Sequence, residues 1–201
     1  MSSVVDICNL ALSHLGDTAT VASIDPPEGS SQAEHCARFY PAARDALLEI
    51  FNWNFATRRA TLALLTADSW DWAYAYAKPA DALKMLAVLP AGASSDAEGA
   101  EYDIETDTDG ATVILTDSED ASLRYIAYVT DTTKFPPLFV MALSWQLASM
   151  LAGPILKGDA GAAEAKRCAG LAQAYLAQAA QSDANQRKVR PVHNPAWMAA
   201  R

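Results

Sequence analysis

The side chains that most often carry out catalysis or hold metals are few in this sequence and widely spaced. Its three histidines and three cysteines are His14, His35, His193, Cys8, Cys36 and Cys168. No two cysteines have the C-x-x-C spacing, and the histidines lack the short spacing of metal ligands, so we expect no metal site and no disulfide framework. The sequence also lacks the glycine loops that bind nucleotides, the H-E-x-x-H zinc motif and the G-x-S-x-G nucleophile motif. It therefore predicts no cofactor and no catalytic residues.

Carboxylates are the remaining candidates for chemistry, and they are concentrated in one stretch. Ten acidic residues and no lysine or arginine lie between Asp96 and Asp120, in a chain with 24 acidic and 15 basic residues. A pair of carboxylates at a suitable separation can hydrolyse a glycan. These acids lie among threonine, serine and glycine rather than among the apolar residues that raise a carboxyl pKa. We therefore predict that the protein is not an enzyme, and a cell-wall glycan hydrolase is the alternative.

Two interpretations of the acidic stretch are open. It is either a solvated loop face, or a negative wall or docking patch that faces another molecule. The residues expected to form this patch are Asp103, Glu105, Asp107, Asp109, Asp117, Glu119 and Asp120.

Length and composition indicate a folded chain with a substantial core. The chain has 201 residues, of which 51% are hydrophobic and 19% charged, which fits one domain or one domain with an insertion. The net charge of −9 argues against coating DNA or an anionic membrane by bulk charge. The first residues carry no signal-peptide features, so we expect the cytoplasm. The apolar run from 135 to 156 is interrupted by polar residues and prolines, and we expect a buried core helix rather than a membrane span.

Apolar residues recur at helical spacing near both ends of the chain. Ser3 and Asp6 predict a capped first helix that ends at Gly16. A capping box from Ser31 to Glu34 predicts the start of a second helix, which should bend near Pro41. A third helix should begin at 136–137 and break at 153–154, and a fourth, rich in alanine, should begin near residue 159.

The period changes to two after residue 70, where Trp72, Tyr74 and Tyr76 alternate with alanines. Further short strands are expected at 83–89, 101–105, 112–116 and 122–129, with a hairpin turn at Asp109–Gly110. The predicted fold is therefore mainly α with a small antiparallel β insertion: an elongated bundle of about four helices, a β subdomain and an extended C-terminal tail. The predicted boundaries are 1–69 and 135–183 for the bundle, 70–134 for the β-rich insertion and 184–201 for a flexible tail.

Two further groups of residues are candidates for contacts. A junction between bundle and insertion is expected from the aromatic residues Trp53, Phe55, Trp72, Tyr74 and Tyr76. The segment after Asp183 contains no acidic residue and four basic ones. Such a segment is either disordered or able to become ordered on a partner, because its cations steer association and its aromatic residue supplies burial. The tail residues expected to bind are Arg187, Lys188, Arg190, His193 and Trp197.

Several segments occur in an order that carries a family resemblance. They are Cys8–Gly16, Ala37–Leu48 leading into Phe51–Arg59, Trp72–Asp81, Leu123–Ile126 and Asp131–Phe139. The most specific are Asn-Trp-Asn-Phe-Ala at 52–56 and Tyr-x-Tyr-x-x-Pro-x-Asp at 74–81, and neither is a catalytic signature. Over residues 4 to 182 the chain resembles the tail tubular protein A family of short-tailed bacteriophages, the head-to-tail adaptors beneath the portal.

The resemblance implies a structural protein of the virion tail that is assembled in the host cytoplasm. It implies a ring of twelve copies between the portal protein and the tail nozzle protein, through which DNA passes without sequence-specific binding. The acidic patch would face the channel or the nozzle, and the tail would grasp the portal. The subunit alone can remain a monomer, because a weak contact is stabilised only when the ring closes. A helical interaction module of a host cell is a further alternative.

Overall fold

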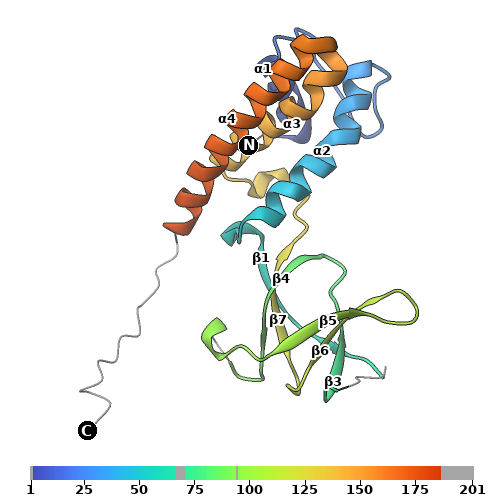
Figure 1. Cartoon of the computed structure of the whole chain (residues 1–201), viewed down its shortest axis with the longest axis vertical. Helices are drawn as coiled ribbons and strands as arrows, with labels where there is room; N and C mark the ends of the chain where they lie inside the picture. Colours follow the sequence, from blue (N-terminus) through green and yellow to red (C-terminus); the bar gives the residue numbers. More distant parts are fainter. Residues whose placement is uncertain (1, 67–70, 94, 187–201) are drawn as a thin grey trace, which may run out of the picture.

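A computed structural model describes residues 2–66, 71–93 and 95–186 of the chain. This part forms a helical subdomain and a β subdomain (Figure 1), which confirms the predicted combination of helices with a β-rich segment. The α-helices are α1 (Val4–His14), α2 (Ser31–Ile50), α3 (Pro137–Leu156) and α4 (Gly158–Ala184). The strands are β1 (Thr57–Thr61), β2 (Ala63–Leu64), β3 (Tyr74–Ala77), β4 (Ala82–Leu89), β5 (Tyr102–Thr106), β6 (Thr112–Thr116) and β7 (Ser122–Ala127). The short 3-10 helices are η1 (Asn54–Ala56), η2 (Asp96–Glu98) and η3 (Thr132–Lys134).

The starts of the first two helices are set by serine caps. Ser3 and Asp6 form the predicted capping box on α1, and Gly16 after that helix has a φ of +74°. Helix α2 begins at Ser31 as expected, but the capping side chain is that of Ser30, whose Oγ accepts from the Ala33 N–H at 3.2 Å. The predicted box at Ser31 is therefore wrong by one position. With Ser30 as the cap, its third helical residue is Ala33, which has no side chain to reach back.

Helix α3 is the core of the helical subdomain and packs against α1, α2 and α4. Phe139, Leu143, Leu147 and Leu151 along it are fully buried. By length and composition alone this helix could also cross a membrane, and half of its apolar window is buried inside the structure. A largely apolar helix that is covered on several sides is typical of a protein core.

Helix α3 continues through Pro154, where the sequence predicted a break, and ends at Leu156. A proline in the final turn removes one N–H donor and leaves little helix beyond it to disrupt. The stop is instead at Lys157 and Gly158, which have φ values of +55° and +58° and reverse the chain into α4. The two helices are closely packed at Gly161, where an added Cβ would lie 2.9 Å from the Ala152 carbonyl oxygen.

The β subdomain consists of two small antiparallel sheets, ordered β1-β7-β4 and β2-β3-β6-β5. On one side they share a nearly continuous strand, because only Leu62 separates β1 from β2 and its N–H donates to the Ala121 carbonyl. On another side a single bridge between Val88 and Ala100 joins β4 to the residues before β5. The sheets thus enclose one apolar core, as in a small barrel.

Strands β1 and β2 were not among the predicted strands, and they lie in the range assigned from sequence to the bundle. The β1 residues Thr-Arg-Arg-Ala-Thr are partly or fully exposed, so this strand lacks the alternation of apolar residues on which the strand predictions rested. The strands expected at 83–89, 101–105, 112–116 and 122–129 agree with β4 to β7 to within a few residues.

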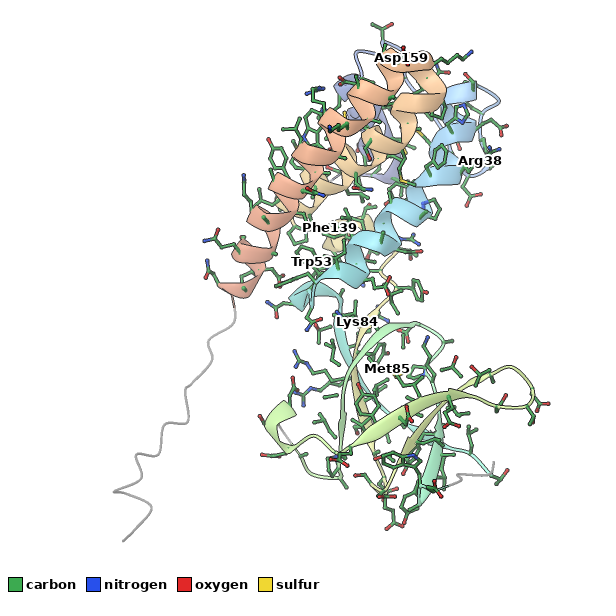
Figure 2. The ribbon with its side chains drawn as sticks, in the orientation of Figure 1. Arg38, Trp53, Lys84, Met85, Phe139 and Asp159 are labelled. Atoms are coloured by element: carbon green, nitrogen blue, oxygen red, sulfur yellow. The ribbon has the colours of Figure 1, made fainter. Side chains whose placement is uncertain are left out.

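The helical core continues onto one side of the β subdomain. Ile126 of β7, with Leu83 and Leu86 of β4, packs into the same apolar cluster as Trp53 and Phe139. Figure 2 shows Lys84 at the end of the β subdomain nearest α2, and its Nζ donates to the Glu49 carbonyl at 3.3 Å. The two subdomains therefore share apolar contacts where α2 leads into β1.

Candidate functional site

The segment Asn52–Ala56, one of the two specific segments, lies where the helical subdomain meets the β subdomain. Trp53 is fully buried, and its ring lies 5.1 Å from that of Phe139 in an edge-on arrangement. Its indole Nε1 donates to the Leu47 carbonyl at 2.8 Å, so the polar atom of this ring is satisfied. Phe55 contacts Phe135 and Phe139. These aromatic contacts fix the end of α2 against the start of α3.

Asn54, in the same segment, holds the last turn of α4. Its backbone N–H donates to the Asp183 carboxylate at 2.9 Å, and its Nδ2 donates to the Asp183 carbonyl at 2.7 Å. The second bond reaches a carbonyl in the last turn of the helix that also accepts from the Gln186 N–H. Residues 129 positions apart are thereby joined at the exit of α4. We call this pair the Asn54–Asp183 latch.

The carboxylate of the latch lies in an unfavourable place. Asp183 is only 3% exposed, and burial raises its pKa above the ordinary aspartate value, an effect that the Asn54 N–H opposes. It also stands at a helix C-terminus, where the helix dipole disfavours negative charge. Sequence reasoning missed Asp183, and the signal available was an acid in the final turn of an alanine-rich helix.

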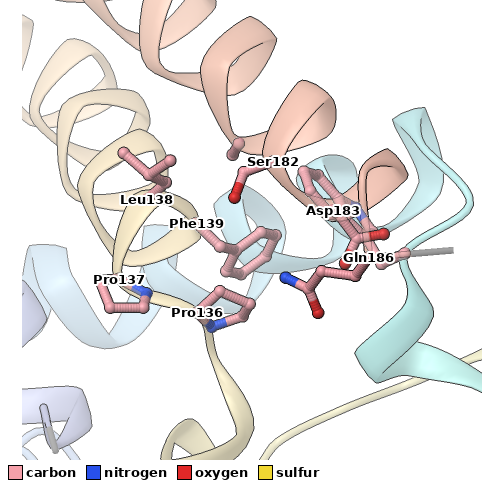
Figure 3. A pocket seen from close by; sticks show the side chains of 9 residues that line it. Pro136, Pro137, Leu138, Phe139, Ser182, Asp183 and Gln186 are labelled. Atoms are coloured by element: carbon pink, nitrogen blue, oxygen red, sulfur yellow. The ribbon is translucent and has the colours of Figure 1, made fainter.

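A half-open pocket of about 290 Å³ adjoins the latch. Figure 3 shows it between the start of α3 and the end of α4. Its lining residues are Trp53, Pro136, Pro137, Leu138, Phe139, Ala179, Ser182, Asp183 and Gln186. Asp183 is the one acidic residue among these lining residues, so the pocket does not supply the two carboxylates that glycan hydrolysis uses. It offers an apolar surface with a carboxylate at its border.

The second specific segment, Tyr74–Asp81, ends in a carboxylate that holds two strands together. Asp81 accepts a hydrogen bond from Arg58 of β1 at 2.6 Å and another from the Tyr125 hydroxyl of β7 at 2.9 Å. Tyr125 is buried, and burial followed by the Asp81 hydrogen bond raises its pKa. The main-chain carbonyl of Asp81 also accepts from the Tyr128 N–H. Asp81 thus joins the start of β4 to both β1 and β7.

The five aromatic residues expected at one junction divide among three clusters. Trp53 and Phe55 lie in the helical core at the junction. Tyr74 and Tyr76 contribute to the core between the two sheets, where the Tyr76 hydroxyl donates to the Ser118 carbonyl at 2.8 Å. Trp72 packs with Ala75 and Leu115 in a third cluster. Trp72 precedes β3, so the alternation that begins at Tyr74 does not place it on the tyrosine face.

The seven acids of the expected patch lie on β5 and in the turns on either side of β6. Asp103 and Glu105 are exposed on β5, an outer strand of its sheet. Asp107 accepts from the backbone N–H groups of Asp109 and Ala111, and Asp117 accepts from that of Ala73. Asp107 therefore also shapes the turn before β6, and Asp117 holds the residue that precedes β3. Glu119 and Asp120 are exposed before β7.

Asp96 differs from these acids because bases from outside the stretch lie beside it. It forms ion pairs with Arg124 of β7 and Arg59 of β1, two residues that face each other across neighbouring strands. The first acid of the stretch therefore contributes little net field. The five residues expected to bind through the tail, Arg187, Lys188, Arg190, His193 and Trp197, lie outside the described residues.

A histidine–serine contact in the helical subdomain could suggest catalysis, but its hydrogen bonds indicate packing. His14 Nε2 lies 3.1 Å from Ser144 Oγ, and this hydroxyl donates to the Met141 carbonyl at 2.9 Å. The Ser144 hydroxyl proton is used in the bond to Met141, so His14 Nε2 must be the donor to Ser144 Oγ. Ser144 is fully buried, and His14 stacks on Trp145 with ring centroids 3.5 Å apart.

The cysteines are buried in the same subdomain. Cys8 and Cys36 are adjacent, and the Cys36 thiol together with burial raises the pKa of Cys8. A buried protonated thiol is a poor nucleophile.

Among the described residues, no group of three or more histidine, cysteine, aspartate or glutamate side chains is placed to hold a metal ion. No protein-family model matches the sequence, and no curated protein matches it in a sequence search.

Proposed function

We propose that the protein is a structural head-to-tail adaptor of a short-tailed phage. In this proposal twelve copies form a ring between the portal protein and the tail nozzle protein, and DNA passes through it without sequence-specific contacts. The protein would be assembled in the host cytoplasm and would reside in the virion tail. The helices would form an elongated bundle that spans the distance between the two neighbours.

The observation that carries the proposal is the role of the two most specific segments of the sequence resemblance. Asn54 joins η1 to the end of α4, and Asp81 joins β4 to β1 and β7. Both are joints between elements, and their polar atoms are used in holding the fold. Specific segments whose polar atoms are used to hold the fold support a structural role rather than a catalytic one.

The distribution of exposed apolar side chains supports contacts between copies. A closed ring needs two different surfaces on each subunit that fit one another. Leu64 of β2 and Ile104 of β5 are exposed and lie on the two outer strands of the four-stranded sheet. Each therefore stands at a different edge, where the next copy could meet it.

The acidic patch supports a surface that does not retain DNA. Asp103, Glu105, Asp109, Glu119 and Asp120 are exposed. DNA gains no counterion release from such a surface, so a channel lined by it would let the genome pass. A ring whose channel is lined by Arg38, Arg44 and Arg58 instead would remove this support.

Portal binding tests the proposal together with the role assigned to the tail. A deletion of residues 187–201 leaves Asp183 and Gln186 in place, so we expect the shortened chain to fold and to lose co-sedimentation with portal rings. A shortened chain that sediments with the portal as fully as the whole chain would refute the tail's role. Glycan-degrading activity of the purified full-length protein in a zymogram would instead favour the hydrolase alternative.

A further inference from the structure

The pocket beside the Asn54–Asp183 latch lies at the C-terminal end of α4, next to the last residue that the structure describes. Gln186, the last residue described, is part of the pocket wall. Fifteen further residues, 187–201, follow it directly. Whatever conformation these residues adopt, they start at the pocket's edge.

The walls of the pocket are suited to an apolar side chain. Trp53 and Phe139 are fully buried beneath the pocket, so the apolar surface open to an occupant is that of Pro136, Pro137 and Leu138. An apolar side chain placed on this surface would remove apolar area from water on both sides. A volume of about 290 Å³ is at the small end for a ligand site and corresponds to one or two side chains.

The sequence after Gln186 complements this surface. It contains Trp197 and two prolines, Pro191 and Pro195, together with four basic residues and no acidic one. The one charged side chain that lines the pocket is the carboxylate of Asp183. Asn194–Pro195 is a dipeptide that favours a turn, which would allow the chain to come back toward its start.

We infer that the pocket beside the Asn54–Asp183 latch binds the chain's own C-terminal segment, with Trp197 filling the apolar part and the neighbouring cations lying toward Asp183. This inference concerns the isolated subunit and does not depend on the adaptor function. Trp197 is 11 residues beyond Gln186, a length that reaches roughly 35 Å when extended, so it can return to the pocket.

Tethering makes a weak contact sufficient. A segment attached beside its site has an effective concentration in the millimolar range. Burial of one large apolar side chain and the pairing of opposite charges both favour the contact. At such an effective concentration, even an affinity of about 1 mM would keep the pocket occupied for about half of the time.

Cross-linking of the full-length chain tests the inference. Ser182 lines the pocket, and Gln181 beside it is also exposed but is not part of the lining. We would compare the pairs S182C/A196C and Q181C/A196C with a short bismaleimide. The native cysteines are buried, and the unsubstituted protein serves as the blank. We expect cross-links within one chain to form at least fivefold faster at position 182 than at position 181.

Added substitutions identify the side chain that occupies the pocket. Trp197→Ala in the S182C/A196C protein should reduce its rate to that of the Q181C pair, whereas Met198→Ala should not. Equal rates at positions 181 and 182 would overturn the inference, and so would an unchanged rate with Trp197→Ala. Cross-links that form faster between chains than within one chain would also overturn it, because the occupant would then be the tail of a second copy.

Discussion

Asn54 and Asp183 are joined by two hydrogen bonds, one to the carboxylate and one to the main-chain carbonyl at the end of α4. The first predicted consequence is that Asp183→Ala destabilises the fold. It leaves the Asn54 N–H without its acceptor, which we expect to lower the free energy of unfolding by about 1–3 kcal/mol. Chemical denaturation measures this, and Ser182→Ala at the exposed neighbouring position should change it by less than about 0.5 kcal/mol.

Asp183→Asn should behave differently from Asp183→Ala, because the amide oxygen of asparagine can still accept from Asn54. Burial raises the pKa of Asp183 above its ordinary value of 3.8, so the folded chain holds this proton more tightly than the unfolded chain. The stability due to Asp183 therefore falls as pH rises from about 3.8 through the raised value. As pH rises above about 3.8, Asp183→Asn should gain stability relative to wild type. If the stability of Asp183→Asn relative to wild type instead decreases as pH rises, the assignment is contradicted.

The joint at Asp81 predicts unequal costs for its two partners. Tyr125 is buried, whereas the side chains of Arg58 and Asp81 are 45% and 38% exposed. Removing the buried hydroxyl with Tyr125→Phe should cost about 1 kcal/mol, and Arg58→Ala should cost less than about 0.5 kcal/mol. A double-mutant cycle with Asp81→Ala should show coupling to Tyr125 that exceeds the coupling to Arg58. The reverse order would show that the ion pair, and not the tyrosine, holds β1 and β7 to β4.

Two glycines of α4 should respond oppositely to alanine. A Cβ at Gly161 would lie 2.9 Å from the Ala152 carbonyl oxygen, so Gly161→Ala must push α3 and α4 apart, at a cost of about 1–3 kcal/mol. Nothing lies within 4 Å of a Cβ at Gly170, so Gly170→Ala should stabilise the helix by about 0.5–1 kcal/mol. Thermal unfolding of both variants is the measurement. A Gly161→Ala protein that unfolds at the same temperature as wild type would mean that α3 and α4 are not closely packed at Gly161.

Acid should weaken the contact between α1, α3 and α4. Burial, and then the Arg167 charge, lower the pKa of His14 below its ordinary value of 6.5. The stability that neutral His14 contributes is complete above about pH 6.5 and is lost as pH falls through the lowered value. Arg167 also pairs with Glu164 and lies over the Trp145 ring. Between about pH 7.5 and 5, the free energy of unfolding measured in urea should fall as pH falls. His14→Gln should abolish this fall, and Arg167→Gln should only reduce it.

The sequence predicted the helices and most strands because their apolar residues recur at a regular period. The first helix and its Ser3–Asp6 cap are an example, since every signal there is local. It did not predict β1, whose residues are largely exposed and which is held by pairing with β7, far along the chain. It also placed the end of α3 at Pro154, although the reversal depends on the backbone of Lys157 and Gly158.

The candidate site was predicted only in part, for the same reason. Trp53 and Phe55 were expected at the junction and lie there. Asp183 was not singled out, because its importance comes from Asn54, which is 129 residues away. A pocket formed by the start of one helix and the end of the next has no local pattern in the sequence.

Imaging the full-length protein mixed with portal rings tests the adaptor proposal most directly. We predict a closed ring of this protein on one end of the portal, with the β subdomains of neighbouring copies in contact. As a control, Ile104→Glu on the exposed edge of β5 should fold and fail to close the ring. Bare portal rings alongside a free monomer, with this protein in molar excess over the portal, would contradict the account.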